Sequence, residues 1–416
     1  MKILGKFITT TLFFSITLVS FSQHYDWRGQ DREGIYYETG LLKAWTEDGP
    51  ELLWEADGLG EGYGSVTISE EIIYVTGRKE DNDIITALSL DGKKLWEKAY
   101  GTTWKRNFTG TRSIPIFYNG DLFMVSGAGE LVCMTSNGEI KWRKNHYEMY
   151  ESKPLMFGIS ESPIVFDNKV VVSPGRDKAS VVAFNIANGE VIWEAEPMNE
   201  GPQYINPKLI DHNGRKIIVT ITESQVIGLD GKDGKLLWKL NYEEINETVG
   251  RARKNHTNTP LYRDGKIFIS NGYKYVSFMI ELNQDGSEAK VGWKSRDIGP
   301  HHGGMVLLGD YIYSTNYLSN SMGDWVCVNW NTGETMWTER WINKGSVIAA
   351  EGMLYLFEEK KGTVGLVKAT PEKFELISSF KMSKGEGPYW AHPVIRDGKL
   401  YLRHGEVLMV HNIKQK

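Results

Sequence analysis

Short runs of hydrophobic residues alternate along this chain with polar turns, and one phrase recurs in register. The phrase consists of a small residue in an apolar strand, a polar turn that ends in Gly, and a Trp four residues after that Gly. Asp-Gly and Asn-Gly pairs supply the positive φ that a tight hairpin needs. The pattern therefore predicts repeated antiparallel hairpins. Copies of the phrase occupy residues 87–96, 133–142, 183–193, 228–238 and 327–337, with a stretched copy at 282–293.

The Trp residues of this phrase recur at the length of one propeller blade. They stand at positions 96, 142, 193, 238, 293 and 337, so successive intervals are 46, 51, 45, 55 and 44 residues. Four-stranded blades have roughly this length, about 40 to 50 residues. A Trp that returns on the strand after the turn has the size to fill the gap between neighbouring blades. The sequence thus predicts an all-β propeller.

A second phrase consists of an apolar strand start followed by an Asx-Gly type of turn. The number of its copies predicts the number of blades. The seventh of these units is degenerate, because residues 374–377 stand where the Trp is expected. We predict an eight-bladed β-propeller of four-stranded antiparallel blades, with seven blades as the alternative if the degenerate unit is only a loop. The starts lie near Ser65, Ser113, Ser162, Asn206, Thr259, Gly303, Ser346 and His392.

The two ends of the repeat array complement each other. The last unit ends at Lys416 without a Trp phrase, whereas residues 52–55 (Leu-Leu-Trp-Glu) resemble an outer strand that has no strands of its own before it. An N-terminal strand that completes the last blade removes both free sheet edges. We therefore predict a single propeller domain over residues 23–416, with an N-terminal extension over 23–50 and a closing strand over 51–56.

The first 22 residues have the pattern of a signal peptide. Lys2 and Lys6 precede an apolar run over residues 7–19, and the small residues Ser20 and Ser22 stand before Gln23. The run is too short to span a bilayer, and no later stretch approaches 18 apolar residues, so we predict no transmembrane segment. Because no Cys lies near the cleavage point, a lipid anchor is not expected. We predict a periplasmic or secreted protein.

The charge of the chain excludes one class of partner, and the positions of its cysteines exclude a disulfide. The 416 residues include 48 Lys and Arg against 53 Asp and Glu, a formal charge of −5, so there is no basic surplus for a nucleic acid. The only two cysteines, Cys133 and Cys327, occupy the small-residue position of the second and sixth units. In a ring of eight these units face each other across the axis, so we predict two buried thiols and no disulfide.

The repeated phrase resembles the tryptophan-docking motif of the quinoprotein-alcohol-dehydrogenase-like propellers, whose repeats are called pyrroloquinoline quinone (PQQ)-like. The N-terminal residues 26–34, Asp-Trp-Arg-Gly-Gln-Asp-Arg-Glu-Gly, are similar to those of exported bacterial members. No Trp of the phrase is followed by Asp, which speaks against a WD40 array. The family includes dehydrogenases, the propeller lipoprotein of the outer-membrane β-barrel assembly machinery, and proteins of unknown role. The dehydrogenases carry a vicinal Cys pair and an acidic Ca²⁺ site, and neither is found in this sequence.

Candidate ligand-binding residues stand just before the innermost strand of each blade, where the fold gathers them at one mouth of the channel. A solvated channel mouth would also place polar residues there. A Zn²⁺ site would need three of the four histidines in this set to approach one another across the axis, and we predict no metal site. Tyr63, Tyr204, Lys344 and Tyr389 stand at equivalent positions. The predicted site residues are Arg112, Glu161, Asn206, His256, His301, His302, Trp390 and His392.

Three functions remain open. We predict a monomeric, non-catalytic binding or scaffold protein whose partner is a protein, a glycan or a small molecule of the cell envelope. The first alternative is a PQQ-type oxidoreductase, a dehydrogenase, because the repeats resemble those of such enzymes. The second is a scaffold similar to the outer-membrane protein assembly factors. No catalytic residues are assigned, since the sequence contains no Gly-x-Ser-x-Gly, His-Glu-x-x-His or Cys-x-x-Cys motif. The cofactor stays open: PQQ is the candidate, and the missing Cys pair and calcium site speak against it.

Overall fold

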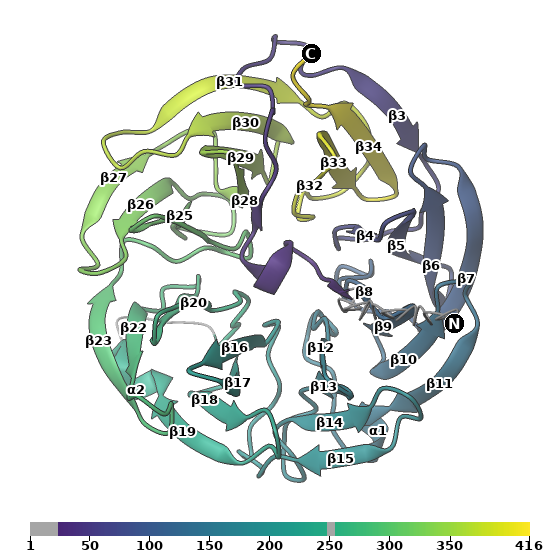
Figure 1. The fold of residues 1–416 in the computed structure, drawn as a ribbon, viewed down its shortest axis with the longest axis vertical. Helices are drawn as coiled ribbons and strands as arrows, with labels where there is room; N and C mark the ends of the chain where they lie inside the picture. The colour runs from purple at the N-terminus through teal and green to yellow at the C-terminus, as the bar shows by residue number, and fades with distance from the viewer. Residues whose placement is uncertain (1–23, 248–253) are drawn as a thin grey trace, which may run out of the picture.

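The computed structural model describes residues 24–247 and 254–416, and their strands form a ring of eight sheets around a central axis (Figure 1). Each sheet contains the four antiparallel strands of one blade, which confirms the eight-bladed propeller. The seventh, degenerate unit is a complete blade. The predicted signal peptide, residues 1–22, lies outside the described residues.

We number the blades by the chain order of their innermost strands. The first four contain β4 Thr67–Ile68, β5 Ile72–Lys79, β6 Asn82–Ser89 and β7 Lys94–Thr102 (blade 1); β8 Ile116–Tyr118, β9 Asp121–Val125, β10 Glu130–Thr135 and β11 Ile140–Asn145 (blade 2); β12 Ile164–Phe166, β13 Lys169–Val172, β14 Val182–Asn185 and β15 Val191–Glu194 (blade 3); β16 Lys208–His212, β17 Arg215–Ile221, β18 Gln225–Asp230 and β19 Leu236–Asn241 (blade 4).

The remaining blades follow the same order. They contain β20 Leu261–Arg263, β21 Lys266–Ile269, β22 Ser277–Leu282 and β23 Ala289–Ser295 (blade 5); β24 Val306–Leu308, β25 Tyr311–Thr315, β26 Trp325–Asn329 and β27 Thr335–Glu339 (blade 6); β28 Gly345–Ala350, β29 Met353–Glu358, β30 Thr363–Lys368 and β31 Glu375–Lys381 (blade 7); β32 Val394–Arg396, β33 Lys399–His404, β34 Val407–Asn412 and the N-terminal β3 Leu52–Ala56 (blade 8).

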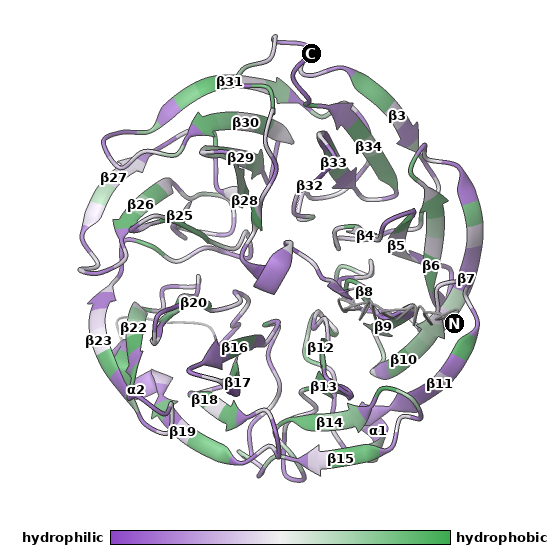
Figure 2. Cartoon of the chain, viewed as in Figure 1, coloured by the Kyte–Doolittle hydropathy of each residue, from purple (hydrophilic) through white to green (hydrophobic). Residues whose placement is uncertain are grey.

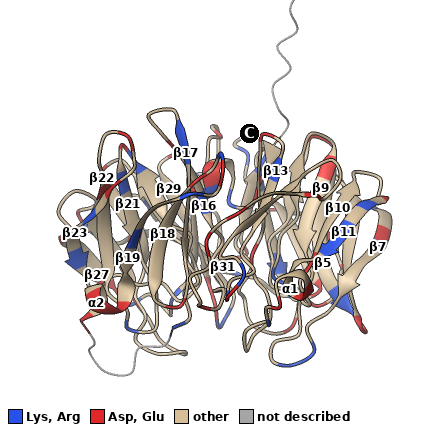
Figure 3. Ribbon diagram, turned by 90° about the horizontal axis from the view of Figure 1, so that it is seen from below, with Lys and Arg blue, Asp and Glu red and all other residues tan. Residues whose placement is uncertain are grey.

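Helices are rare in the described chain. The turns η1 (Gln30–Arg32), α1 (His146–Met149) and α2 (Tyr242–Asn246) have three to five residues each. No helix of the described residues has the length and apolarity needed to cross a membrane. Because α1 and α2 each follow the fourth strand of a blade, they lie toward the same face of the ring in the side view (Figure 3).

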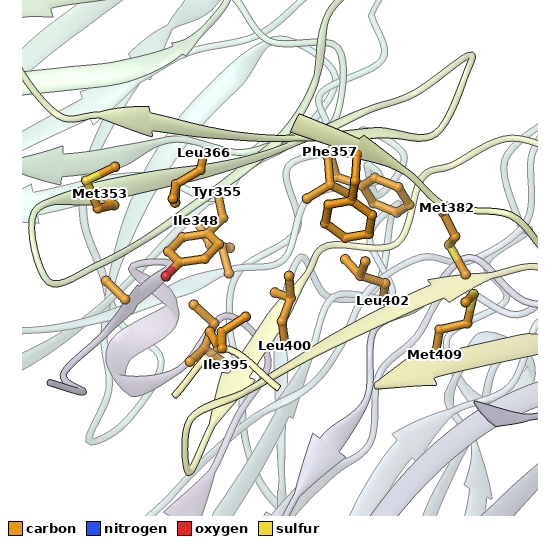
Figure 4. Close-up of a cluster of buried hydrophobic side chains, with 14 of the residues drawn as sticks. Ile348, Met353, Tyr355, Phe357, Leu366, Met382, Ile395, Leu400, Leu402 and Met409 are labelled. Atoms are coloured by element: carbon orange, nitrogen blue, oxygen red, sulfur yellow. The ribbon is translucent and has the colours of Figure 1, made fainter. Parts of the chain in front are cut away.

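Hydrophobic and hydrophilic residues alternate on the outer strands (Figure 2), but most of the buried hydrophobic residues lie on the inner three strands of each blade. On β11, β15 and β19 the single buried residue is the Trp of the repeated phrase. Much of the core lies between neighbouring sheets. Between blades 7 and 8, for example, Phe357 of β29 packs with Leu400 and Leu402 of β33 (Figure 4).

The small residue of the phrase lies directly opposite the Trp in the strand ladder. Cys133 pairs with Trp142 and Cys327 pairs with Trp337, as Ala and Gly do in other blades, and the register shifts immediately after each small residue. A bulky side chain there would meet the indole across the strands. Both thiols are buried and free, as predicted.

Each turn Gly of the phrase receives the indole of the preceding blade. A Cβ atom on Gly234 would lie 2.4 Å from the ring of Trp193, and one on Gly333 would lie 2.4 Å from the ring of Trp293. The predicted inter-blade docking of the Trp is therefore correct. The stretched copy departs from it, because a Cβ on Gly286 would meet Ile217 and His212 instead.

Substitutions at two turn glycines of blade 4 would separate the effect of this docking on stability from the effect of backbone conformation. Gly214 and Gly234 both have positive φ, 84° and 76°, but a Cβ on Gly214 would have no atom within 4 Å. We expect Gly214→Ala to lower the free energy of unfolding by about 1 kcal/mol, the cost of a left-handed residue. Gly234→Ala should lower it by about 3 kcal/mol, because the methyl group also displaces Trp193. Urea unfolding measures both, and equal losses would contradict the docking role.

The N-terminal strand β3 closes the ring by pairing antiparallel with β34, so that Trp54 lies opposite Val410. A Cβ on Gly92 of blade 1 would lie 2.5 Å from the Trp54 ring, so the closing blade docks on blade 1 through the same Trp–Gly contact as Trp193 and Gly234. The predicted closure is thus confirmed.

Residues 24–36, here called the axial segment, cross the centre of the ring (Figure 1). The segment begins with β1 (His24–Tyr25), which pairs with the innermost strand of blade 2, and ends with β2 (Ile35–Tyr36), which runs parallel to the innermost strand of blade 7. Between them η1 lies on the axis. The chain then runs to the rim, where Leu41 bridges to Lys414 before β3 begins.

Two buried arginines fix the axial segment to the blades. Arg28 donates hydrogen bonds to the carbonyl oxygens of Met305 in the loop before β24 (2.5 Å) and of Val347 on β28 (3.0 Å). Arg32 donates to the carbonyl oxygens of Ser162 and Pro207 at 3.2 and 3.0 Å, in the loops before β12 and β16. The segment is therefore a plug that ties together the inner ends of opposite blades.

Candidate functional site

A cavity of about 380 Å³ lies at one mouth of the channel. Its walls come from the loops that enter the innermost strands of several blades and from loops between second and third strands. Trp27 of the axial segment also lines it. The aromatic residues around the cavity are Trp27, Tyr63, Phe108, Phe157, Tyr204, Tyr273 and Trp390.

Six of the eight predicted site residues line this cavity. They are Arg112, Asn206, His301, His302, Trp390 and His392. These six positions thus meet at one cavity, and ligand binding by their side chains stays a prediction.

Glu161 and His256 do not line it. The Glu161 carboxylate turns into its own blade and accepts hydrogen bonds from the backbone N–H and the hydroxyl of Ser173, at 3.1 and 3.0 Å. Burial raises the pKa of Glu161 to about 7. His256 stacks on Tyr242 at 5.1 Å, and its Nε2 bonds to the carbonyl oxygen of Glu223. Both side chains satisfy local groups, so they hold loops rather than face the cavity.

His392 connects the cavity to the axial segment. The Arg28 guanidinium lies 2.6 Å from His392 Nδ1, and because arginine only donates, Nδ1 is the acceptor and Nε2 carries the proton. That proton is donated to the carbonyl oxygen of His302 at 3.0 Å. Trp27 meets the His392 ring edge to face at 5.0 Å. Burial, with the charge of Arg28, lowers the pKa of His392 well below its usual range, so it is a neutral positioning residue.

Trp390 is at the centre of an aromatic wall. Its ring lies 5.0 Å from Tyr63, 4.9 Å from Phe108 and 4.9 Å from His302. The Arg112 guanidinium lies over the Tyr63 ring at 5.3 Å. Phe108 is 47% exposed, so part of this wall faces solvent. Such a surface suits a flat apolar or aromatic group, with Arg112 as the nearby cation.

A polar cluster lies beside the aromatic wall. Lys344 and Glu359 are both buried, and Lys344 Nζ lies 2.7 Å from Glu359 Oε1. His301 Nδ1 lies 3.4 Å and His302 Nε2 lies 3.8 Å from Glu359 Oε2. Burial alone would raise the pKa of Glu359, but the hydrogen bond from His301 and the neighbouring positive charges outweigh it and hold that pKa at about 2. Burial lowers the pKa of both histidines.

The sequence did not single out several residues of the cavity. Phe108 and Phe157 lie in long loops before β8 and β12, and Tyr273 and Glu359 lie in loops between second and third strands. The predicted site residues all stand just before the innermost strands. Repeat equivalence also applies to the loop between the second and third strands of each blade. Polar and aromatic residues in these loops would have predicted Tyr273 and Glu359.

The lining residues do not fit PQQ. The quinone carries three carboxylate groups, so its site must offer free cations. The cations that line the cavity are Lys360 and Arg112, and Arg112 donates to the carbonyl oxygens of Phe108 and Gly110, so two cations would face three carboxylates. Among the described lining residues Glu359 is the only carboxylate, whereas the Ca²⁺ that accompanies the quinone takes six to eight oxygen ligands. Neither group is therefore assigned to this cavity.

Solved structures similar to this chain are propellers of differing function. BamB from Moraxella catarrhalis matches with a TM-score of 0.59 at 13% identity, covering 88% of this chain and 98% of that one. A europium-containing methanol dehydrogenase matches with a TM-score of 0.50 at 12% identity, covering 91% and 89%. At such low identity these likenesses show the fold alone.

Curated relatives match over part of their length. The outer membrane protein assembly factor BamB of Shewanella oneidensis is 22% identical over 248 residues, which is 58% of this chain and 56% of the relative. An uncharacterised protein of Rickettsia conorii is 24% identical over 241 residues, 56% and 53% of the two chains. The chain thus spans about half the length of the curated relatives it matches.

The family model described as outer membrane protein assembly factor BamB matches residues 81–339, from β6 to the end of β27. This range covers more than half of the chain and contains four of the inter-blade Trp–Gly contacts. On this match, the protein belongs to the PQQ-like propeller family of outer membrane protein assembly factor BamB.

Proposed function

We propose that this protein is an exported, non-catalytic propeller that binds a protein partner of the cell envelope at the channel mouth. The observation that carries the proposal is the aromatic wall around Trp390, part of which faces solvent through Phe108. Aromatic residues in a concave site are the usual anchors of a protein interface. The partner we propose is an extended segment that inserts an apolar or aromatic side chain into the cavity.

Family membership supports a scaffold role in this proposal. The relative from Shewanella oneidensis is named an outer membrane protein assembly factor, and the family model carries the same description. The predicted signal peptide over residues 1–22 would deliver this chain to the same compartment. More specifically, we therefore propose that the protein is a scaffold similar to the outer membrane protein assembly factors.

Photocrosslinking tests this proposal in the source cells. Phe108, which is 47% exposed at the cavity, is replaced by p-benzoylphenylalanine, and crosslinked envelope proteins are identified by mass spectrometry. Tyr37, which is 74% exposed and does not line the cavity, receives the same label as the matched control. We expect a partner captured from position 108 alone, with capture reduced at least tenfold by Trp390→Ala.

Three outcomes would overturn the proposal: equal capture from both positions, capture unaffected by Trp390→Ala, or crosslinks to glycan only. The last would reassign the aromatic wall to stacking on sugar rings. His392 is unsuitable for this test because its imidazole holds Arg28, so its loss would loosen the axial segment.

A further inference from the structure

Three side-chain atoms in the polar cluster converge on one point. His301 Nδ1, His302 Nε2 and Glu359 Oε2 all lie within 4.8 Å of one another. Two of the separations are 3.4 and 3.8 Å, measured from Glu359 Oε2 to His301 and to His302. Ligand atoms that surround a tetrahedral ion at about 2.0–2.1 Å lie about 3.4 Å apart. The spacing is therefore close to that of ligands around a metal ion, whereas the His301 contact is at the long end for a hydrogen bond and the His302 contact is beyond it.

The outward atoms of two of these side chains are held by other residues. Tyr273 places its hydroxyl 2.8 Å from His301 Nε2, so Nδ1 is the nitrogen that faces Glu359. Lys344 binds Glu359 Oε1 at 2.7 Å, so Oε2 is the oxygen that faces the histidines. Such outer hydrogen bonds orient first-shell ligands in metal sites.

His302 supplies an independent observation. Its Nε2 is a buried atom with no hydrogen-bond partner among the described residues, although such atoms are paired in most proteins. The ring packs against His301 at 4.1 Å and against Trp390 at 4.9 Å. The unpaired nitrogen is thus aimed at Glu359 by packing, and a bound ion would satisfy it.

We propose that His301, His302 and Glu359 bind a divalent transition-metal ion of the Zn²⁺ class at the channel mouth. Two imidazoles and one carboxylate favour Zn²⁺ over Ca²⁺ or Mg²⁺, which take oxygen ligands. All three residues line the cavity, so a fourth coordination position faces its interior. Because Lys344 shares the carboxylate, we expect weaker binding than in a closed four-ligand site.

This site differs from the zinc site considered from the sequence. Two of the four histidines in that set, His301 and His302, meet here, but the third ligand is a carboxylate from blade 7. His256 lies against Tyr242, and His392 is occupied by Arg28 and the His302 carbonyl. The inference goes beyond the proposed partner binding, because these three residues could bind a metal ion without any partner. Metal binding can therefore be measured on the purified chain alone.

Titration of untagged, chelator-treated protein with ZnCl₂ tests the inference. Isothermal calorimetry and elemental analysis after gel filtration should show one ion per chain. His302→Ala should weaken binding at least tenfold, and its Nε2 has no protein hydrogen bond to lose. The matched control is His24→Ala, since His24 also lies beside a carboxylate, 3.8 Å from Asp26, but outside the cavity. This control should bind as the wild type does.

Absence of stoichiometric binding, or binding unchanged by His302→Ala, would overturn the inference. So would loss of binding in His24→Ala, which would reveal adventitious binding. A second measurement protects the test if His302→Ala folds poorly. Co²⁺ bound to the wild-type chain should give the strong visible absorption of a four-coordinate ion, and the weak absorption of an octahedral ion would refute the site. Photocrosslinking from position 108 reports on partner binding separately, so the two proposals can fail independently.

Discussion

Replacing Arg32 with Met should lower the free energy of unfolding by about 3 to 5 kcal/mol, the range found when one partner of a buried ion pair is removed. The guanidinium of Arg32 is buried on the axis, where its Nε donates to Asp26 at 2.8 Å. It also donates to the carbonyl oxygens of Ser162, Pro163 and Pro207. Met has an unbranched side chain but no hydrogen-bond donor, so one carboxylate and three carbonyl groups lose the guanidinium that donates to them. Urea unfolding followed by Trp fluorescence measures the loss.

Arg340→Met is the matched control for this substitution. Arg340 also pairs with one aspartate, Asp324, but its side chain is 48% exposed, and water replaces the lost contact. We expect a much smaller change for this variant. Hydrogen exchange should locate the effect of Arg32→Met in the inner strands of blades 3 and 4. If both variants unfolded at the same urea concentration, the axial plug would have no part in holding the ring.

The fold was predictable because its determinants are local and repeated. A small residue opposite a Trp, as in the pair Cys133 and Trp142, and a Gly that receives the next indole lie within about fifty residues of each other. Each blade repeats the same constraint, so even the degenerate seventh unit is placed by its neighbours. The closing strand was predictable for the same reason, since an unpaired outer strand at one end matches a missing one at the other.

The axial segment was not predictable in this way. Its strands β1 and β2 have two residues each, too short for any periodicity to show. Its anchors join residues more than a hundred positions apart, and Arg28 bonds to His392 across 364 positions. Residues 26–34 showed only a resemblance to exported bacterial members of the family, with no repeat to place them in the ring. Isolated long-range contacts of this kind have no local signal.

The candidate site falls between these two cases. Positions just before the innermost strands were equivalent by repeat, so Arg112, His301 and Trp390 were found in the cavity that they line. Which of them face the cavity depends on side-chain direction, and Glu161 turned instead to Ser173. Glu359 was missed because it stands in a different loop of the blade. Repeat symmetry predicts where the chain is, whereas the neighbours of each side chain decide its contacts.

Removing the closing strand should abolish the folded monomer. A chain of residues 57–416 lacks β3, so β34 (Val407–Asn412), whose side chains are mostly buried, becomes an unpaired sheet edge. Gly92 also loses the Trp54 indole. Exposed apolar edges pair with other chains, so we expect oligomers or aggregates in gel filtration with light scattering.

A chain of residues 40–416 separates closure from the axial plug. It lacks β1 and β2 but keeps β3 (Leu52–Ala56), so it should elute as the wild type does and melt at a lower temperature. A synthetic peptide of residues 49–57, added to the 57–416 chain during refolding, should restore the wild-type elution volume. The same peptide with Trp54→Ala should restore it less well, because it pairs with β34 but does not dock on blade 1. If the 57–416 chain already eluted and melted like the 40–416 chain, the ring would not depend on β3, and blade 8 would be stable with three strands.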